Sequence, residues 1–141
     1  MQIDDDYLIH QFLVVSRFFV KTLNNQIAAY DCYSSGWAVL NFLAHQEGVL
    51  QTELAAKLQV ELAAVSKTCK RLEEKGLICR RSKQDKREKY IYLTAKGRAH
   101  HEELAAVVAR HRQAVLAGLT AEEKENLLFS LKKIYTNLSK F

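Results

Sequence analysis

A short, highly charged run holds the side chains best suited to chemistry on a polyanion. It reads Lys83-Gln-Asp-Lys-Arg-Glu-Lys89, and Asp85 precedes Arg87 by two residues. Residues two apart on an extended segment point to the same side, so the Asp85 carboxylate can orient the Arg87 guanidinium through paired hydrogen bonds. An oriented arginine at the tip of a β-hairpin suits the narrow, negative minor groove of DNA. Lys86 and Lys89 would add phosphate contacts, which fix register without reading sequence.

A second group of polar residues lies on a predicted helix at 63–75. Ser66, Lys67, Lys70 and Arg71 fall on its outward faces. A helix fits the major groove of DNA, where lysine and arginine reach phosphates or guanine edges. A solvated amphipathic helix is the alternative interpretation of the same pattern.

Two alanines precede this group, at a point where base contacts are expected. Ala63 and Ala64 can touch thymine methyl groups but cannot read a hydrogen-bond donor or acceptor. The predicted DNA-binding residues are Ala63, Ala64, Ser66, Lys67, Lys70, Arg71, Arg81, Lys83, Asp85, Lys86, Arg87 and Lys89.

The elements that position these residues follow from periodicity and turn signals. Two short helices at 51–58 and 63–75, joined by a turn in which Val60 is a plausible plug, form a helix-turn-helix at about 51–75. Gly76 suits the left-handed cap that ends the second helix. Two strand-like runs, at 77–80 and 90–93, predict a β-hairpin that forms a wing at about 77–93.

Long helices flank this winged helix. Apolar residues at three- and four-residue spacing predict a helix over the first thirty residues, and the stretch at 33–36 is expected to break it before a second helix that ends at Gly48. Thr94 can cap a helix from 95, whose predicted inward stripe includes Val115, and Thr120 to Glu123 is a capping box for a last helix. The end helices carry more apolar surface than the small central lobe can cover. A second copy of the chain is the simplest partner for them.

Charge and composition narrow the class of protein. Residues 51–98 hold 13 Lys or Arg against 6 Asp or Glu, a net charge of +7, whereas the remainder has a net charge of −2. Such a basic block favours a polyanionic partner. No apolar run reaches the length of a membrane span, and the acidic start does not resemble a signal peptide, so we expect a cytoplasmic protein. The sequence shows no nucleophile–base pair and no phosphate-binding loop, and we predict no enzyme and no cofactor.

The chain resembles the MarR (multiple antibiotic resistance regulator) family. The run from Asp85 to Gly97 fits the wing signature D-x-R-x5-L-T-x-x-G at every fixed position, with Leu93 and Thr94 in place. The resemblance implies one domain over 1–141. A winged-helix lobe would span 33–98, and intertwined dimerisation helices would cover 1–32 and 95–141. It also implies that the helix around Ser66 enters the major groove and that Arg87 enters the minor groove.

Members of the family are often repressors that a small aromatic acid, a metal or an oxidant releases from DNA. Arg17, Lys21, Tyr33 and Trp37 could line a crevice for an aromatic or anionic effector. Alternatively, Trp37 is part of the core and Arg17 is a surface or dimer-contact residue. The adjacent pair His100 and His101 makes a poor metal site, and we predict no metal.

Three cysteines leave a redox role open. Cys32 could be exposed beside its tyrosine neighbours, although nothing nearby obviously lowers its pKa, and Cys69 reads as part of the core. Reduced structural thiols are the alternative for both.

The sequence thus predicts a mainly α protein with a small β-hairpin wing (α+β), a winged helix-turn-helix flanked by N- and C-terminal dimerisation helices. The expected function is a homodimeric, sequence-specific transcriptional regulator, a repressor released by an effector, on a pseudo-palindromic double-stranded operator. A winged-helix protein-interaction module and a nonspecific DNA-binding protein are the alternatives.

Overall fold

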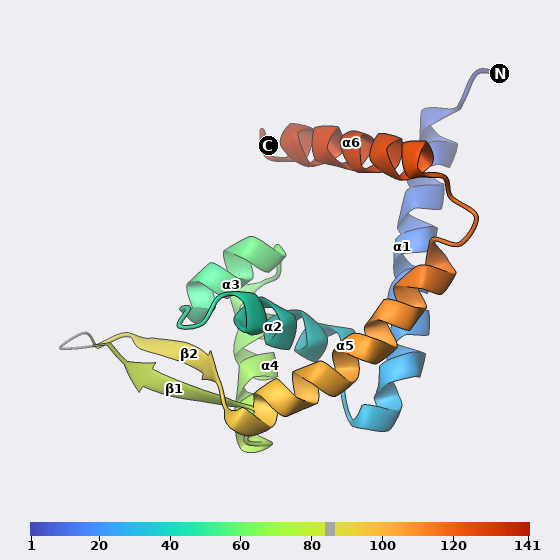
Figure 1. The fold of residues 1–141 in the computed structure, drawn as a ribbon. Coiled ribbons are helices and arrows are strands. Elements are labelled where there is room, and N and C mark those ends of the chain that lie inside the picture. The colour runs from blue at the N-terminus through green and yellow to red at the C-terminus, as the bar shows by residue number, and fades with distance from the viewer. Residues whose placement is uncertain (84–86) are drawn as a thin grey trace. The chain divides into compact units, whose positions relative to one another are not determined.

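A computed structural model of the chain describes residues 1–83 and 87–141. Its elements are α1 (Asp5–Ile27), η1 (Ala28–Tyr30), α2 (Ser34–His45), α3 (Gln51–Leu58), α4 (Leu62–Glu74), β1 (Ile78–Ser82), β2 (Lys89–Leu93), α5 (Ala95–Val115) and α6 (Ala121–Leu138) (Figure 1). The chain divides into two compact units, Met1–His111 and Arg112–Phe141. The predicted class, mainly α with a small β-hairpin, is confirmed.

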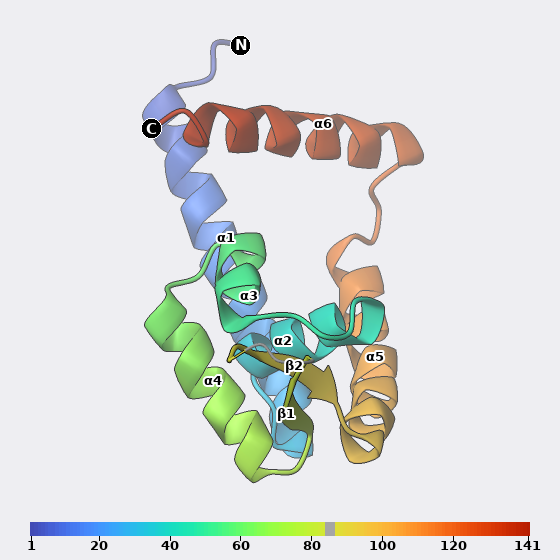
Figure 2. The same cartoon turned by 90° about the vertical axis from the view of Figure 1, so that its left-hand side faces the viewer.

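The first unit is organised around α2. This helix packs against α1, α3, α4 and β2, and α4 packs in turn against α3 and β1. Figure 2 shows α4 along one edge of this unit, with α3 and the hairpin as its neighbours. The strands β1 and β2 pair antiparallel, from Ile78 opposite Leu93 to Ser82 opposite Lys89.

One apolar core joins these elements. The fully buried side chains come from the end of α1, from α2 to α4, from the hairpin and from α5; they are Ile27, Val39, Leu40, Leu43, Val49, Leu54, Cys69, Ile78, Ile91, Leu104 and Val108. The predicted inward residues of α4, Val65, Cys69 and Leu72, are all buried. The core therefore fixes which face of α4 is left for solvent or a ligand.

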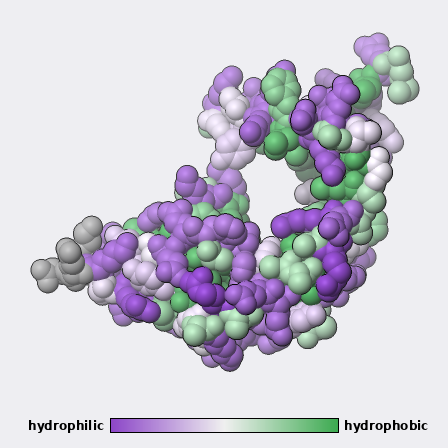
Figure 3. Space-filling model, in the orientation of Figure 1, coloured by the Kyte–Doolittle hydropathy of each residue, from purple (hydrophilic) through white to green (hydrophobic). Residues whose placement is uncertain are grey.

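The helix at the N-terminus leaves most of its apolar stripe uncovered. Asp4 caps α1 by accepting a hydrogen bond from the Asp6 amide at 3.3 Å. Of the predicted stripe only Leu23 and Ile27, in the last turns, are buried. Figure 3 shows hydrophobic side chains gathered along α1, whereas hydrophilic ones cover most of the visible face of α3 and the hairpin.

The second unit holds the end of α5 and one capped helix, α6. Thr120 Oγ1 accepts a hydrogen bond from the Glu123 amide at 3.1 Å, and the Glu123 carboxylate accepts from the Thr120 amide at 3.2 Å. The predicted capping box is confirmed. No residue of α6 is buried.

Three sequence predictions about local structure were wrong. The break between the first two helices is present but lies at 31–33 and not at 33–36, because Ser34 to Gly36 form the first turn of α2, where Asn24 Oδ1 accepts a hydrogen bond from the Ser34 amide at 2.7 Å. Val60 is exposed rather than a plug, since Gln59 takes a left-handed conformation that turns the chain outward. Val115 is also exposed, at the last residue of α5.

Candidate nucleic-acid interface

The outward face of α4 carries the residues that the sequence singled out. Ala63, Ala64, Ser66, Lys67 and Lys70 are all exposed, opposite the buried stripe that holds the helix on α2 and α3. The helix thus presents two small residues, a hydroxyl and two ammonium groups on one surface. That surface is chemically suited to the major groove.

The caps of α3 and the turn that follows it lead the chain into α4. The Leu50 amide donates to Glu53 Oε1 at 3.4 Å, so a glutamate serves where Leu50 offers no capping side chain. Gln59 ends α3 at φ 54°, and the Val60 amide donates to the Ala55 carbonyl at 3.0 Å. The predicted helix-turn-helix is therefore present between Gln51 and Glu74.

The hairpin carries its cations over aromatic rings. The Arg81 guanidinium lies 5.0 Å from the centre of the Tyr92 ring, and Lys83 Nζ lies 4.3 Å from the centre of the Tyr90 ring. Such contacts restrict a flexible side chain while leaving its charge available. The sequence analysis missed the role of both tyrosines. Their alternation with Ile91, which is buried, was the available signal.

The tip of the hairpin is described in part. Arg87 and Lys89 are exposed. Asp85 and Lys86 lie outside the described residues, so the predicted orientation of Arg87 by Asp85 stays a prediction.

A single β-bridge anchors the hairpin to the lobe. Val49 and Ile91 form a bridge, with the Ile91 amide donating to the Val49 carbonyl at 2.8 Å. Gly48, at φ 75°, makes room for the Tyr92 ring, which would lie 3.0 Å from a Cβ at that position. This docking was not predicted, because a single bridge leaves no periodic pattern.

The signature residues at the base of the wing have a mechanical role. Thr94 Oγ1 accepts a hydrogen bond from the Gly97 amide at 3.0 Å, which caps α5, and donates to the Gly76 carbonyl at 2.6 Å. Gly76 has the predicted left-handed conformation, at φ 76°. A Cβ on Gly97 would overlap the Leu77 carbonyl, so glycine lets α5 pack directly against the segment that joins α4 to β1.

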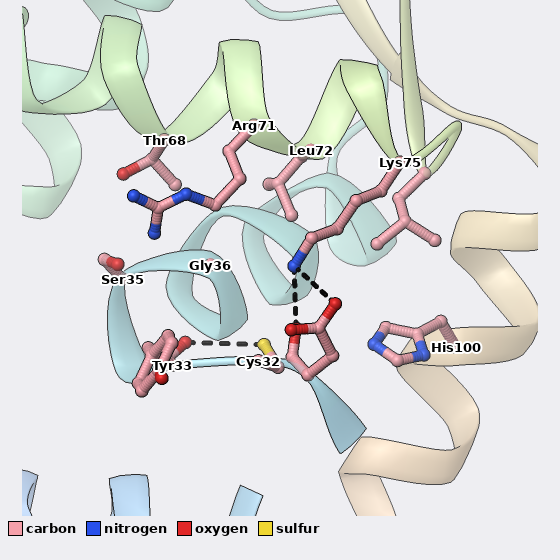
Figure 4. A pocket seen from close by; sticks show the side chains of 11 residues that line it. Cys32, Tyr33, Ser35, Gly36, Thr68, Arg71, Leu72, Lys75 and His100 are labelled. Carbon is pink, nitrogen blue, oxygen red and sulfur yellow. Dashed lines mark hydrogen bonds and ion pairs between the residues drawn. The ribbon is translucent and has the colours of Figure 1, made fainter. Parts of the chain in front are cut away.

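A small pocket lies between α4 and the start of α2. Figure 4 shows Thr68 and Arg71 projecting from α4 toward Tyr33 and Ser35. The Lys75 side chain, which follows α4, ends beside Cys32. Arg71, predicted to contact DNA, thus lines this pocket as well as being exposed.

The four predicted effector residues are only partly brought together. Tyr33 is exposed and lines the pocket beside α4. Trp37 is buried in the core, where its ring stacks on His101 at 5.0 Å. Arg17 and Lys21 are exposed on α1. These placements agree with the core interpretation of Trp37.

The cysteines do not have the surroundings of reactive thiols. Cys32 is buried, as the alternative of a structural thiol predicts, and the possibility that it is exposed is excluded. Burial raises the pKa of Cys32 and raises that of Cys69 to about 11. Both thiols are therefore protonated near neutral pH, which suppresses their nucleophilicity.

Two histidines form an aromatic cluster between α2 and α5. His101 Nε2 lies 3.0 Å from Asn41 Oδ1. The His45 ring stands edge-on to the His101 ring, with 6.4 Å between the ring centres. Burial lowers the pKa of His101, and the neighbouring His45 lowers it further. Among the described residues, no group of three or more His, Cys, Asp or Glu could hold a metal ion.

These observations define a class of protein. A helix-turn-helix with an exposed basic face, followed by a hairpin that carries stacked cations, is a winged-helix DNA-binding domain. Within the described residues, no helix is both long enough and apolar enough to cross a membrane.

The chain belongs to the MarR family. The family's sequence model matches residues 36–88. The chain is 37% identical over 119 residues to the uncharacterized HTH-type transcriptional regulator YwoH of Bacillus subtilis (strain 168). The aligned residues cover 84% of this chain and 87% of YwoH. Proteins of this kind are transcriptional regulators, and the chain is a DNA-binding regulator of MarR type, not an enzyme.

Solved structures of the family support the fold. The Staphylococcus aureus MepR–DNA complex matches with a TM-score of 0.83 at 26% identity, over 96% of each chain. A cysteine-to-serine mutant of Escherichia coli MarR in complex with operator DNA matches with a TM-score of 0.83 at 28% identity, over 90% of this chain and 92% of that one.

Proposed function

We propose that the protein acts as a homodimer that binds a pseudo-palindromic operator in double-stranded DNA and represses transcription until a small aromatic or anionic effector releases it. The observation that carries the proposal is the exposed cationic surface formed by α4 and the hairpin. A regulator that binds DNA would act in the cytoplasm, where a bacterial chromosome is accessible.

The cationic surface has two parts with different tasks. Lys67 and Lys70 lie on a helix that the major groove can admit, and Ser66 offers a hydroxyl to base edges. On the hairpin, Arg81 and Lys83 are held over tyrosine rings, which suits contacts with the backbone or the minor groove. We assign phosphate contacts to the lysines and the minor-groove contact to Arg87.

A second copy of this chain is the partner that best fits the uncovered face of α1. Large apolar side chains are exposed along this helix; they are Tyr7, Leu8, Ile9, Phe12, Leu13, Val14, Val15, Phe18 and Val20. α6 likewise exposes Leu127, Leu128, Phe129, Tyr135 and Leu138. Monomeric proteins rarely leave patches of this kind in water, and a twofold dimer can bury the same patch on both subunits.

The dimer is tested by sedimentation of two α1 variants. Phe12→Asp places a charge in the apolar face and should shift the protein toward monomer at micromolar concentration. Gln11→Asp adds a charge at the neighbouring, already polar position and serves as the control. An unchanged dimer in the Phe12 variant would argue against this interface.

The effector part of the proposal concerns the region around Tyr33. This exposed ring lines the same small pocket as Arg71, so an aromatic carboxylate bound at the pocket mouth could meet an apolar face and a cation. Arg17 and Lys21, which are exposed on α1, remain the other proposed contacts, whereas the buried Trp37 is no longer one of them. Benzoate is a suitable probe: it should weaken DNA binding by the wild-type protein but not by a Tyr33→Ala variant. Equal weakening of both would exclude Tyr33 from the site.

Selection of duplexes from random DNA tests the function as a whole. Repeated rounds with the wild-type protein should enrich a sequence with twofold symmetry, because two copies of α4 would contact two half-sites. A nonspecific DNA-binding protein would bind without enrichment. A protein-interaction module, the possibility favoured by the exposed Ala63 and Ala64, would not bind DNA at all.

A further inference from the structure

Asp31 connects the end of the first helical segment to the end of α4. Lys75 Nζ lies 3.1 Å from Asp31 Oδ2 and also donates a hydrogen bond to the Asp31 carbonyl at 2.9 Å (Figure 4). Lys75 is the residue at which α4 ends, and Asp31 ends η1. We infer that Asp31 is a positioning residue for DNA binding, which acts through Lys75 to hold α4 in the orientation that its exposed face requires. The inference rests on the proposed function.

The same end of α4 receives two further contacts from outside the helix. Lys96 Nζ donates to the Lys75 carbonyl at 2.9 Å, and Thr94 Oγ1 donates to the Gly76 carbonyl at 2.6 Å. At the opposite end, Glu61 makes no side-chain capping bond. The buried stripe of Val65, Cys69 and Leu72 holds α4 on its neighbours along its length, whereas these polar contacts all act at its C-terminal end. They therefore set the tilt of the helix on that apolar base.

The length of α4 amplifies a small change at its C-terminal end. Ala63 lies twelve residues from Lys75, about 18 Å along a helix at 1.5 Å per residue. A tilt of about 5° at Lys75 would displace the Ala63 end by roughly 1.5 Å over that length. Such a shift is large compared with the tolerance of a hydrogen bond to a base edge.

Exposure argues that this ion pair orients the helix more than it stabilises the fold. The Asp31 side chain is 84% exposed and that of Lys75 is 31% exposed. Ion pairs this accessible contribute little to the free energy of folding. Asp31 also has φ 55°, a left-handed conformation that aspartate and asparagine tolerate better than most residues. The backbone shape thus directs both acceptors of Asp31 at the end of α4.

Asp31→Asn separates positioning from simple electrostatics. The substitution keeps the left-handed backbone and the carbonyl acceptor but removes one negative charge. Electrostatics alone predicts tighter binding to any DNA, because the net positive charge increases. Positioning predicts the opposite for a selected operator, a loss of about fivefold, the scale of one charge-assisted hydrogen bond that is partly exposed. Binding to a random duplex should stay equal or become tighter.

Two further variants make the test specific. Glu74→Gln, also on α4, makes the same change in charge, and Glu74 forms no ion pair with any residue that the structure describes. This control should not weaken operator binding. In a Lys75→Gln background, Asp31→Asn should have no further effect, because the partner through which it acts is gone. Thermal unfolding of each variant checks the fold, and Asp31→Gly, which also suits φ 55°, replaces Asp31→Asn if that variant is poorly folded.

Two results would overturn the inference. One is an operator affinity of Asp31→Asn equal to that of the Glu74→Gln control. The other is a double variant, Asp31→Asn with Lys75→Gln, whose loss of operator affinity equals the sum of the two single losses. If the wild-type protein enriches no duplex, the proposed function fails instead. Hydrogen exchange then tests the link alone: the amides of Gly76 and Leu77, which donate to carbonyls of α4, should exchange faster in Asp31→Asn, and equal exchange would contradict it.

Discussion

Replacing Gly97 with alanine should disrupt the junction between the two DNA-binding elements. A Cβ at this position would overlap the Leu77 carbonyl oxygen and approach its carbonyl carbon to 2.9 Å. That carbonyl also accepts a hydrogen bond from the Thr94 amide at 3.1 Å. Neither atom belongs to a flexible side chain, so relief of the overlap requires the backbone to move.

The size of the effect follows from three contributions. Displacing packed backbone costs about 3 kcal/mol, the upper part of the usual range for overpacking. Losing the Thr94–Leu77 hydrogen bond costs about 1 kcal/mol. The higher helix propensity of alanine returns about 1 kcal/mol. The free energy of unfolding should therefore fall by about 3 kcal/mol, which for a chain of this length lowers the unfolding midpoint by roughly 10 °C.

Gly36→Ala is a matched control. Gly36 is also buried and is also the third residue of its helix, but a Cβ there would meet only Cys32 Sγ at 3.4 Å and Leu72 Cδ2 at 3.7 Å. This variant should be as stable as the wild type or slightly more stable. Thermal unfolding followed by circular dichroism at one fixed protein concentration compares the three proteins. If Gly97→Ala unfolds at the same temperature as Gly36→Ala, the contact between Gly97 and the Leu77 carbonyl does not require glycine at position 97.

Three further predictions concern DNA binding and pH. Arg87→Ala should weaken binding to a selected operator by about 1–3 kcal/mol in a fluorescence titration, and unchanged affinity would exclude Arg87 from the groove. Wild-type affinity should fall with salt with a log–log slope near −7 if a dimer neutralises about eight phosphates, and a flat dependence would contradict a phosphate-based interface. Burial lowers the pKa of His101 below 6.5 in the folded protein. As the pH falls, His101 therefore becomes protonated more readily in the unfolded chain than in the folded one. Stability should therefore fall as pH drops through about 6.5, and less so in His101→Gln, when unfolding is measured in urea between about pH 7.5 and 5.5; parallel curves would refute this.

Local signals in the sequence predicted much of the fold. The short helix that ends at Leu58, the buried residues of α4 and the cap formed by Thr94 were all confirmed, because each depends on spacing or on a residue's own conformational preference. The start of α2 was misjudged because its first turn is built from two serines and a glycine, and the capping atom, Asn24 Oδ1, lies ten residues away.

The interface was predictable in its composition but not in its support. The exposed cations follow from the amphipathic pattern of α4 and from the charge of the hairpin. The contact between Asp31 and Lys75 joins residues 44 apart in the chain, and no periodicity announces it. The same holds for the bridge between Val49 and Ile91. Such contacts depend on how elements pack, which a single sequence does not encode in local patterns.

The central claim, that this chain reads a DNA sequence, is tested most directly by one ratio of affinities. The wild-type protein is titrated at physiological salt against the duplex enriched from random DNA and against a shuffled duplex of the same length and composition. Sequence-specific regulators bind their sites at least about 10³ times more tightly than nonspecific DNA, and this ratio is expected here. Equal affinity for the two duplexes would contradict the account.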